Sequence, residues 1–202
     1  ISCPGCYPTS ILLPLIPLIQ KKKIDTTNIV IDSKSGYSGA GRGVHKKYKE
    51  KNLYDSLTAY GVGFHRHNSE IHQELKNVSN SKISFIFTPH LSPMFRGILS
   101  TIYVTLKKGS SIKNIHNILK RFHNKNKFVK ILNINSSIST NDVINTNYCF
   151  ISACKTKYKN KIVILSAIDN LIKGGAGQAV QNMNLKYDFK ESEGLKWRSL
   201  YI

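Results

Sequence analysis

The residues of this chain with the clearest capacity for chemistry lie within its first ten positions. Cys6 follows directly after Gly5, and Cys3 stands three residues before Cys6. Gly5 allows the backbone to turn tightly ahead of the thiol, and Thr9 or Ser10 can cap a helix that starts just after it. A thiol at a helix N-terminus feels the positive end of the helix dipole, so we expect its pKa to fall from about 8.5 toward roughly 4–7. Cys6 is the candidate nucleophile, and a buried structural cysteine is the alternative.

The four cysteines also allow two other kinds of site. Cys3 and Cys6 have the spacing of a thiol–disulfide redox pair, but no βαβ pattern precedes them. A zinc site would need Cys149 and Cys154 as well, and that second pair lies far along the chain with the wrong spacing. Four cysteines in 202 residues make no disulfide framework, so we expect a reducing, cytoplasmic location and no bound metal.

The charge of the chain is strongly positive, with 30 Lys and Arg against 11 Asp and Glu. Only five of these cations are Arg, although Arg is the side chain that makes planar, bidentate contacts to phosphate. Lys, Ile and Asn are all abundant, and all three are encoded by A/T-rich codons. We therefore interpret the lysines as solvated surface and expect no nucleic-acid partner.

The elements that must position these residues follow from the apolar pattern. Strands are predicted near residues 29–31, 83–87, 99–106, 127–134 and 162–168, and a loop near 135–147. Ser111 is expected to cap a 3.6-periodic helix, and a last helix follows the glycines at 174–177. The mainly apolar run at 11–19 is too short for a membrane span and contains two prolines. This pattern predicts an α+β domain with no membrane partner.

The Pro-Gly-Cys-Tyr-Pro-Thr block at residues 4–9 resembles the active-site signature of the N-acetyl-gamma-glutamyl-phosphate reductases, which are NADPH-dependent semialdehyde dehydrogenases of arginine biosynthesis. Further blocks agree in the same order, at residues 32–42, 65–71, 88–97 and 166–184. Five colinear blocks across nearly the whole chain are far more specific than any one of them. The resemblance implies an α+β fold of the glyceraldehyde-3-phosphate dehydrogenase-like C-terminal catalytic type. Such a domain has a mixed, mostly antiparallel sheet with helices on one face.

The resemblance also implies a reaction at Cys6. Its thiolate would attack the acyl phosphate of N-acetyl-gamma-glutamyl phosphate and expel phosphate, and the resulting thioester would be reduced to the semialdehyde. An imidazole suits the base that takes the thiol proton, and we favour His65 for this role. If residues 65–67 form a strand, His65 and His67 share a face, so that one is catalytic and the other orients the substrate.

The anionic substrate requires cations and N–H donors. The substrate-binding residues implied by the resemblance are Ser35, Gly36, Arg42, His67, Glu70 and Arg96. Arg42 and Arg96 stand out in a chain rich in lysine, although each could form a structural ion pair instead. Glu70 is expected to orient a histidine or Arg66.

The cofactor implied is NADP(H), and Asn170 is the expected contact to its nicotinamide carboxamide. The glycines at 174–177 and 39–43 do not match the G-x-G-x-x-G spacing of a dinucleotide fingerprint. We therefore expect a C-terminal catalytic part that lacks an N-terminal Rossmann domain. Residues 1–173 form its catalytic domain, and residues 174–202 form a helix and tail that pack on the absent NADP-binding domain. A homodimer or homotetramer is expected for the complete enzyme.

Other functions remain open at this point. The chain alone could be a non-catalytic fragment. A related reductase that acts on a carrier-bound aminoadipyl phosphate in lysine synthesis shares much of the pattern. The thiol–disulfide oxidoreductase is the more remote alternative. Cys3 stands where the family usually has Asn, and a disulfide between Cys3 and Cys6 would block the nucleophile.

Overall fold

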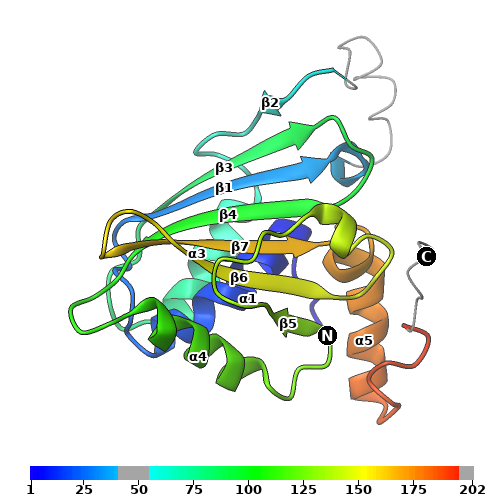
Figure 1. Cartoon of the computed structure of the whole chain (residues 1–202). Coiled ribbons are helices and arrows are strands. Elements are labelled where there is room, and N and C mark those ends of the chain that lie inside the picture. The colour runs from blue at the N-terminus through cyan, green and yellow to red at the C-terminus, as the bar shows by residue number, and fades with distance from the viewer. Residues whose placement is uncertain (41–54, 196–202) are drawn as a thin grey trace.

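The computed structural model describes residues 1–40 and 55–195, and within these ranges the chain forms a seven-stranded mixed sheet (Figure 1). The strand order is β2-β3-β1-β4-β7-β6-β5. Pairs β1–β4, β4–β7, β6–β7 and β2–β3 are antiparallel, while β1–β3 and β5–β6 are parallel. The strands are β1 (Ile29–Gly36), β2 (Thr58–Ala59), β3 (Phe85–Ser92), β4 (Ile98–Thr105), β5 (Val129–Ile131), β6 (Cys149–Lys155) and β7 (Lys161–Ile168). The predicted mixed, mostly antiparallel sheet is confirmed.

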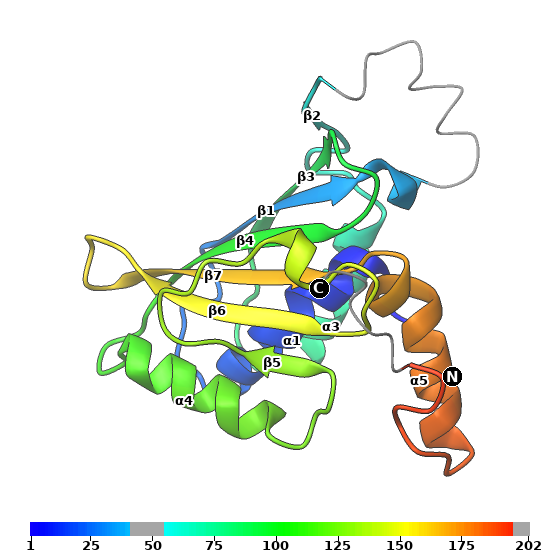
Figure 2. The same ribbon diagram turned by 45° about the vertical axis from the view of Figure 1, so that its right-hand side comes forward.

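Three helices pack on one face of this sheet, and a fourth stands beyond its end (Figures 1 and 2). The covering helices are α1 (Cys6–Gln20), α3 (His67–Asn77) and α4 (Ile112–His123), and the fourth is α5 (Gly177–Lys186). Alternate strand residues such as Ile31 and Ile102 are fully buried beneath α1, whose Ile11, Leu15 and Leu18 complete this core. Burial of these side chains drives the association of the helices with the sheet.

Helix α4 begins where its sequence predicts. The Ser111 hydroxyl accepts a hydrogen bond from the backbone N–H of Asn114, and the Asn114 side chain accepts in return from the backbone N–H of Ser111. The strands predicted near 29–31, 83–87, 99–106 and 162–168 are also present, and the one near 127–134 is shorter. Strand β6, which carries two of the cysteines, was not predicted.

Helix α1 contains Pro14 and Pro17, which the apolar pattern alone does not place in a helix. Because Pro17 has no N–H, the carbonyl of Leu13 loses its donor within the helix. The Nε2 atom of His123 on α4 lies 2.9 Å from that carbonyl oxygen, and Nδ1 accepts from the side-chain amide of Asn126 at 2.8 Å. Burial lowers the pKa of His123, which favours the neutral ring that both contacts require. One imidazole from the neighbouring helix therefore compensates for the proline.

One end of the sheet collects the segments with candidate site residues. Strands β1, β3 and β7 end there, β4 begins there, and the N-terminus of α1 lies at the same end (Figure 1). Helix α5 is attached here too, since the side-chain amide of Gln178 donates to the carbonyl of Pro4 and to the hydroxyl of Thr9. The division at residue 173 stays a prediction. None of the helices within the described ranges is long and apolar enough to cross a membrane.

The contact between His123 and Leu13 makes the first prediction. A His123→Leu substitution fills similar space but leaves a buried carbonyl without a donor, so it should lower the free energy of unfolding by about 2 kcal/mol. Urea unfolding followed by circular dichroism measures this. Lys120→Ala, on the exposed side of α4, is the control and should cost far less. Equal losses in the two variants would contradict the role given to His123.

Candidate active site

Cys6 is the first residue of α1, with Gly5 at the N-cap position. The predicted caps are wrong, because the helix begins before them and its N-cap makes no side-chain hydrogen bond. Thr9 instead donates its hydroxyl to the carbonyl of Gly5 at 2.9 Å, and Ser10 joins a buried hydroxyl contact to Ser100 at 2.7 Å. Small hydroxyl side chains let the first turn of α1 approach the sheet closely and place Cys6 at its end.

The loop before α5 lies directly against the thiol-bearing residue. A Cβ atom added to Gly174 would stand only 2.6 Å from the Cβ of Cys6, closer than real side chains approach one another. Only glycine fits at position 174 while Cys6 keeps its place. This close approach places residues 169–174 against Cys6, although they are distant from it in sequence.

The pKa of the Cys6 thiol is raised, which contradicts the expected lowering. Burial is the largest cause, and it outweighs the backbone N–H groups of Tyr7 and Cys6 and the positive charge of Arg66, all of which lower the pKa. The helix N-terminus lowers the pKa of Cys6, as predicted, but by less than burial raises it. A thiol in this setting is protonated near neutral pH, so attack by its sulfur requires a base.

The histidine motif is not the strand that its alternation predicts. His65 lies in a turn, and His67 is the first residue of α3. The backbone N–H of His67 donates to Nδ1 of His65 at 3.2 Å, and the two ring centroids are 4.9 Å apart. The two imidazoles are therefore neighbours, as expected, but a turn into a helix brings them together.

The two imidazoles differ in their relation to the cysteine loop. Nε2 of His67 lies against Gly5, since a Cβ added to Gly5 would be 2.4 Å from that nitrogen. His65 contacts the aromatic rings of Tyr60 and Phe87, each with centroids 5.5 Å from its own. The structure thus places His67 beside the residue that precedes Cys6.

Both imidazoles are uncharged near neutral pH. The pKa of His65 is lowered to about 4, first by burial and then by His67 and Arg66. The pKa of His67 is also lowered to about 4, by burial and by Arg66. A neutral imidazole has one nitrogen lone pair that can accept a proton. In His65 this lone pair, on Nδ1, accepts from the His67 N–H, whereas Nδ1 of His67 has no hydrogen-bond partner.

Glu70 has a different partner from the one predicted. Its Oε1 atom accepts a hydrogen bond from the backbone N–H of Gly5 at 2.9 Å, rather than from a histidine or Arg66. This contact joins α3 to the segment that carries Cys6. Glu70 therefore sets the distance between the histidine turn and the start of α1.

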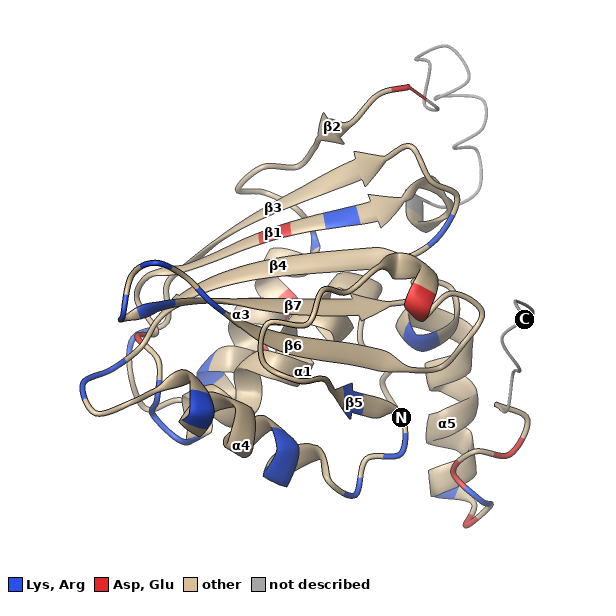
Figure 3. Ribbon diagram, in the orientation of Figure 1, with Lys and Arg blue, Asp and Glu red and all other residues tan. Residues whose placement is uncertain are grey.

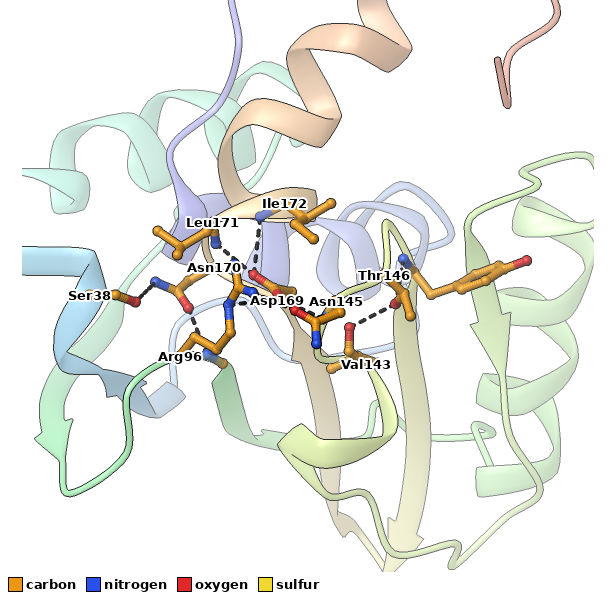
Figure 4. A network of polar contacts seen from close by, with 11 residues as sticks. Ser38, Arg96, Val143, Asn145, Thr146, Asp169, Asn170, Leu171 and Ile172 are labelled. Carbon is orange, nitrogen blue, oxygen red and sulfur yellow. Dashed lines mark hydrogen bonds and ion pairs between the residues drawn. The ribbon is translucent and has the colours of Figure 1, made fainter. Parts of the chain in front are cut away.

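A polar network surrounds the buried carboxylate of Asp169 (Figure 4). Oδ1 accepts from the backbone N–H groups of Leu171 at 2.8 Å and Ile172 at 3.1 Å. Oδ2 accepts from the backbone N–H of Asn145 at 2.8 Å and lies 3.2 Å from Nε of Arg96, an ion pair without hydrogen-bond alignment. The sequence analysis did not select Asp169, although an Asp-Asn pair ahead of a glycine-rich turn is a capping signal.

Arg96 and Asn170, both predicted as ligand-binding residues, belong to this network. The Arg96 guanidinium pairs with Asp169, donates to the side-chain carbonyl of Asn145 and keeps part of its surface exposed. The Asn170 amide accepts from the backbone N–H of Gly97 at 2.6 Å and donates to the hydroxyl of Ser38 at 3.0 Å. Each side chain therefore has partners within the chain, and their roles toward a ligand stay predictions.

Ser35 and Gly36 end strand β1 at this site, whereas Arg42 lies outside the described residues. The Ser35 hydroxyl donates to the Gly36 carbonyl at 3.0 Å and lies within hydrogen-bonding reach of Tyr7. A Cβ added to Gly36 would be 2.6 Å from the backbone of Arg96. This glycine is what allows Arg96 to approach the end of β1.

The cysteines do not gather into one site. Cys3 is exposed and accepts from the side-chain amide of Asn182 at 3.4 Å, while Cys149 is fully buried in the sheet beside Ser166. All four thiols are free. Within residues 1–40 and 55–195, no three His, Cys, Asp or Glu side chains are arranged to hold a metal ion. These positions contradict the zinc alternative.

Among the residues that the structure describes, lysines gather mainly at the far end of the sheet and on α4 (Figure 3). The turns at that far end join the C-terminus of α1, the end of β4 and the β6–β7 hairpin. They carry Lys21, Lys22, Lys23, Lys107, Lys108, Lys157 and Lys159. Most of these side chains are exposed, so these lysines form solvated surface away from Cys6.

Comparisons with known proteins agree with this geometry. Residues 6–170 match the family model "Semialdehyde dehydrogenase, dimerisation domain". The chain is 42% identical over 201 residues to an N-acetyl-gamma-glutamyl-phosphate reductase of Staphylococcus aureus, a match that covers 100% of this chain and 59% of the relative. It is 45% identical over 202 residues to a probable chloroplastic N-acetyl-gamma-glutamyl-phosphate reductase of Oryza sativa, covering 98% of this chain and 48% of that protein. The chain thus spans roughly half to three-fifths of these relatives.

Solved structures show the same fold at much lower identity. An aspartate semialdehyde dehydrogenase II from Vibrio cholerae aligns with a TM-score of 0.70 at 14% identity, covering 92% of this chain and 61% of that one. A probable aspartate-semialdehyde dehydrogenase from Pseudomonas aeruginosa aligns with a TM-score of 0.69 at 14% identity, covering 92% and 62%. The predicted fold class is confirmed by these neighbours.

The Asp169 network makes the second prediction. Asp169→Asn keeps the shape of the side chain but removes its charge from a fully buried position, so it should lower the free energy of unfolding by at least about 2 kcal/mol. Asp142→Asn is the matched control, because Asp142 also accepts a backbone N–H bond but is exposed. We expect the control to lose less than about 1 kcal/mol in urea unfolding. Similar losses would show that the buried charge is not important.

Proposed function

We propose a reaction for this chain from the family to which it belongs. The chain is a member of the semialdehyde dehydrogenase family, because residues 6–170 match the model of that family's dimerisation domain. The reaction is the reduction of N-acetyl-gamma-glutamyl phosphate to N-acetyl-glutamate 5-semialdehyde and phosphate. The substrate is taken from the names of the relatives at 42% and 45% identity. The observation that supports this most directly is the placement of Cys6 at a helix N-terminus directly after Gly5, against which the neutral imidazole of His67 lies.

In this proposal Cys6 is the nucleophile. Its sulfur bonds to the acyl carbon, the bond from that carbon to the phosphate oxygen breaks, and phosphate leaves with the electron pair. Because burial keeps the thiol protonated, its proton must pass to a base as the sulfur attacks. The product of this half-reaction is a thioester on Cys6. Free N–H groups in the first turn of α1 can stabilise negative charge that develops beside the sulfur.

The base is one of the two histidines. The sequence analysis favoured His65, whereas the contacts favour His67, because its Nε2 lies against Gly5 and its Nδ1 is buried without a hydrogen-bond partner. We assign proton transfer to His67 and give His65 the role of holding it, through the bond from the His67 N–H to Nδ1 of His65. The protonated imidazole later returns its proton to the thiolate that leaves the thiohemiacetal.

NADPH supplies the hydride when it is bound. The described residues offer it one candidate contact, Asn170, whose amide oxygen and nitrogen are each bonded within the chain. Asn170 can contact the nicotinamide either with these two bonds in place or by replacing one of them with a bond to the cofactor. We assign no binding site for the cofactor phosphates to the described residues. The anionic groups of the substrate are assigned to Arg96 and, outside the described residues, to Arg42. The backbone at Ser35 and Gly36 lies next to Arg96 and can line the same site.

The matching family is a dimerisation domain, which supports oligomerisation. We assign the contact between copies to the sheet face opposite the helices. This face exposes 61% of Ile86 and 46% of Tyr103, which lie on β3 and β4. Large apolar side chains on an uncovered sheet face are typical of an interface between subunits. Pairing through this face gives the dimer or tetramer that we propose.

Two other functions remain as alternatives. A reductase of carrier-bound aminoadipyl phosphate would use the same cysteine and histidines. A chain without activity of its own would lack the thioester step. The thiol–disulfide oxidoreductase is disfavoured, since Gly5 is extended between the two cysteines and Cys3 contacts Asn182 on α5.

The third prediction tests the thioester. We expect incubation of the reduced chain with N-acetyl-gamma-glutamyl phosphate to add one N-acetylglutamyl group, seen by intact mass, and Cys6→Ser to abolish it. His67→Asn should slow this acylation about 100-fold or more at neutral pH, and His65→Asn should slow it less. No adduct on a folded chain would contradict the proposed function. A larger effect of His65→Asn would assign the base to His65.

The fourth prediction tests the sheet face. Tyr103→Lys should convert the oligomer to monomers in sedimentation velocity, because a charge would have to be buried between copies. Phe122→Lys is the matched control, since Phe122 is 44% exposed but lies on α4, on the helical side. A monomeric wild-type chain, or dissociation by both variants alike, would exclude the sheet face as the interface.

A further inference from the structure

We propose that Tyr7 is a positioning residue that acts through the two histidines. Its ring packs against His65 and His67, which are partly buried, and shields them from water next to Gly5, the residue before Cys6. The inference deepens the proposed function, because it explains how one of these imidazoles is kept ready to accept the thiol proton. It concerns a residue whose side chain stands outside the proposed chemistry.

The ring of Tyr7 is the central member of an aromatic cluster. It is 2% exposed and stands edge-on to His65, with centroids 5.5 Å apart and planes at 88°. It contacts His67 at 6.0 Å and Phe87 at 5.3 Å in the same edge-to-face manner. Tyr7 thus touches both imidazoles and the sheet beneath them, and such contacts restrain ring orientation.

The other two rings of this cluster, those of Tyr60 and Phe87, contact His65. The rings of Tyr60 and Phe87 each lie 5.5 Å from the His65 ring, at interplanar angles of 71° and 89°. His67 has Tyr7 on one side and the Gly5 backbone on another. Removal of Tyr7 should therefore affect both imidazoles, whereas removal of Tyr60 should affect mainly His65.

Hydrogen bonds at the far end of Tyr7 fix its ring. The hydroxyls of Tyr7 and Tyr60 share a bond of 3.1 Å, and the Tyr7 hydroxyl also donates to the carbonyl of His90 at 3.4 Å. The Ser35 hydroxyl is within reach of the same oxygen. Burial raises the pKa of Tyr7 well above its usual value, so the phenol stays neutral. The hydroxyl anchors the ring to β1 and β3, and the ring meets the imidazoles.

The charged and titratable groups around the imidazoles do not account for the lowered pKa values of His65 and His67. Arg66 disfavours a second positive charge, but it is exposed and acts less strongly than burial on both rings. The carboxylate of Glu70, which would favour a protonated ring, is bonded to the Gly5 N–H. Cys6 on α1 stays a neutral thiol, and Phe87 presents β3 without charge. Partial burial, to which the aromatic rings contribute, is thus the largest cause of the lowered pKa values.

The test is a titration of the histidine ring signals by NMR in the full chain, with three variants. Tyr7→Ala opens a space for water beside both rings and should raise the pKa of His65 and of His67 by at least one unit toward 6.5. Tyr7→Phe keeps the aromatic ring and should leave the pKa values of both histidines at about 4. Tyr60→Ala should raise the pKa of His65 more than that of His67, which Tyr60 reaches only through Tyr7. The exposed His72 on α3 is the internal reference in every sample.

Several outcomes would overturn the proposal. A folded Tyr7→Ala chain with unchanged titration of both rings would do so, as would Tyr7→Phe behaving like Tyr7→Ala. If Tyr7→Ala does not fold, Tyr60→Ala decides, and equal shifts or no shift in the two rings would count against the proposal. The titration needs no substrate, so failure of the acylation assay alone would reject the proposed reaction and not the aromatic cluster. Where acylation occurs, its acid limb should move upward in Tyr7→Ala by the same interval as the titration.

Discussion

The arrangement of the candidate site depends on the backbone of one glycine. The N–H of Gly5 binds Glu70 of α3, its carbonyl accepts from Thr9, and its bare Cα leaves room for the ring of His67. Any side chain at this position would displace the imidazole from the cysteine loop. Helices α1 and α3 start far apart in the chain, and their first turns are thereby held on either side of the Gly5 backbone. The His67 ring can lie against the residue before Cys6 because Gly5 has no side chain.

Burial has opposite consequences for the ionisable groups at this end of the sheet. It raises the pKa of Cys6 and lowers those of His65 and His67, so all three are uncharged near neutral pH. Asp169 is also fully buried, but three backbone N–H groups and Arg96 surround its two oxygens. The carboxylate of Asp169 thus has many polar partners, whereas the Cys6 thiol and the two imidazoles have few.

Much of the scaffold could be predicted from sequence, because its elements are governed by local rules. Apolar alternation located most strands, and Ser111 with Asn114 located the start of α4. A helix beginning near Cys6 was expected, but how it tolerates Pro17 was not, because the donor that compensates for this proline, His123, is more than 100 residues away. The same limit applies to the site. Residue types selected the candidate nucleophile Cys6 and neighbouring candidates, but neither the balance of burial against the helix dipole at Cys6 nor the partner of Glu70 is encoded in spacing.

The pairing pattern of the sheet has a consequence for the order of events during folding. Strand β1 lies between β3 and β4, which follow it by dozens of residues, and β4 pairs with β7 across a similar gap. Contacts of such large sequence separation form slowly, because a long loop must close before any of them contributes stability. The residues assembled at the end of the sheet belong to segments near positions 6, 35, 67, 96 and 170, so no short stretch can form the site early. Reactivity at Cys6 should therefore emerge only with the last cooperative step of folding, and a partly folded chain would carry an unassisted thiol.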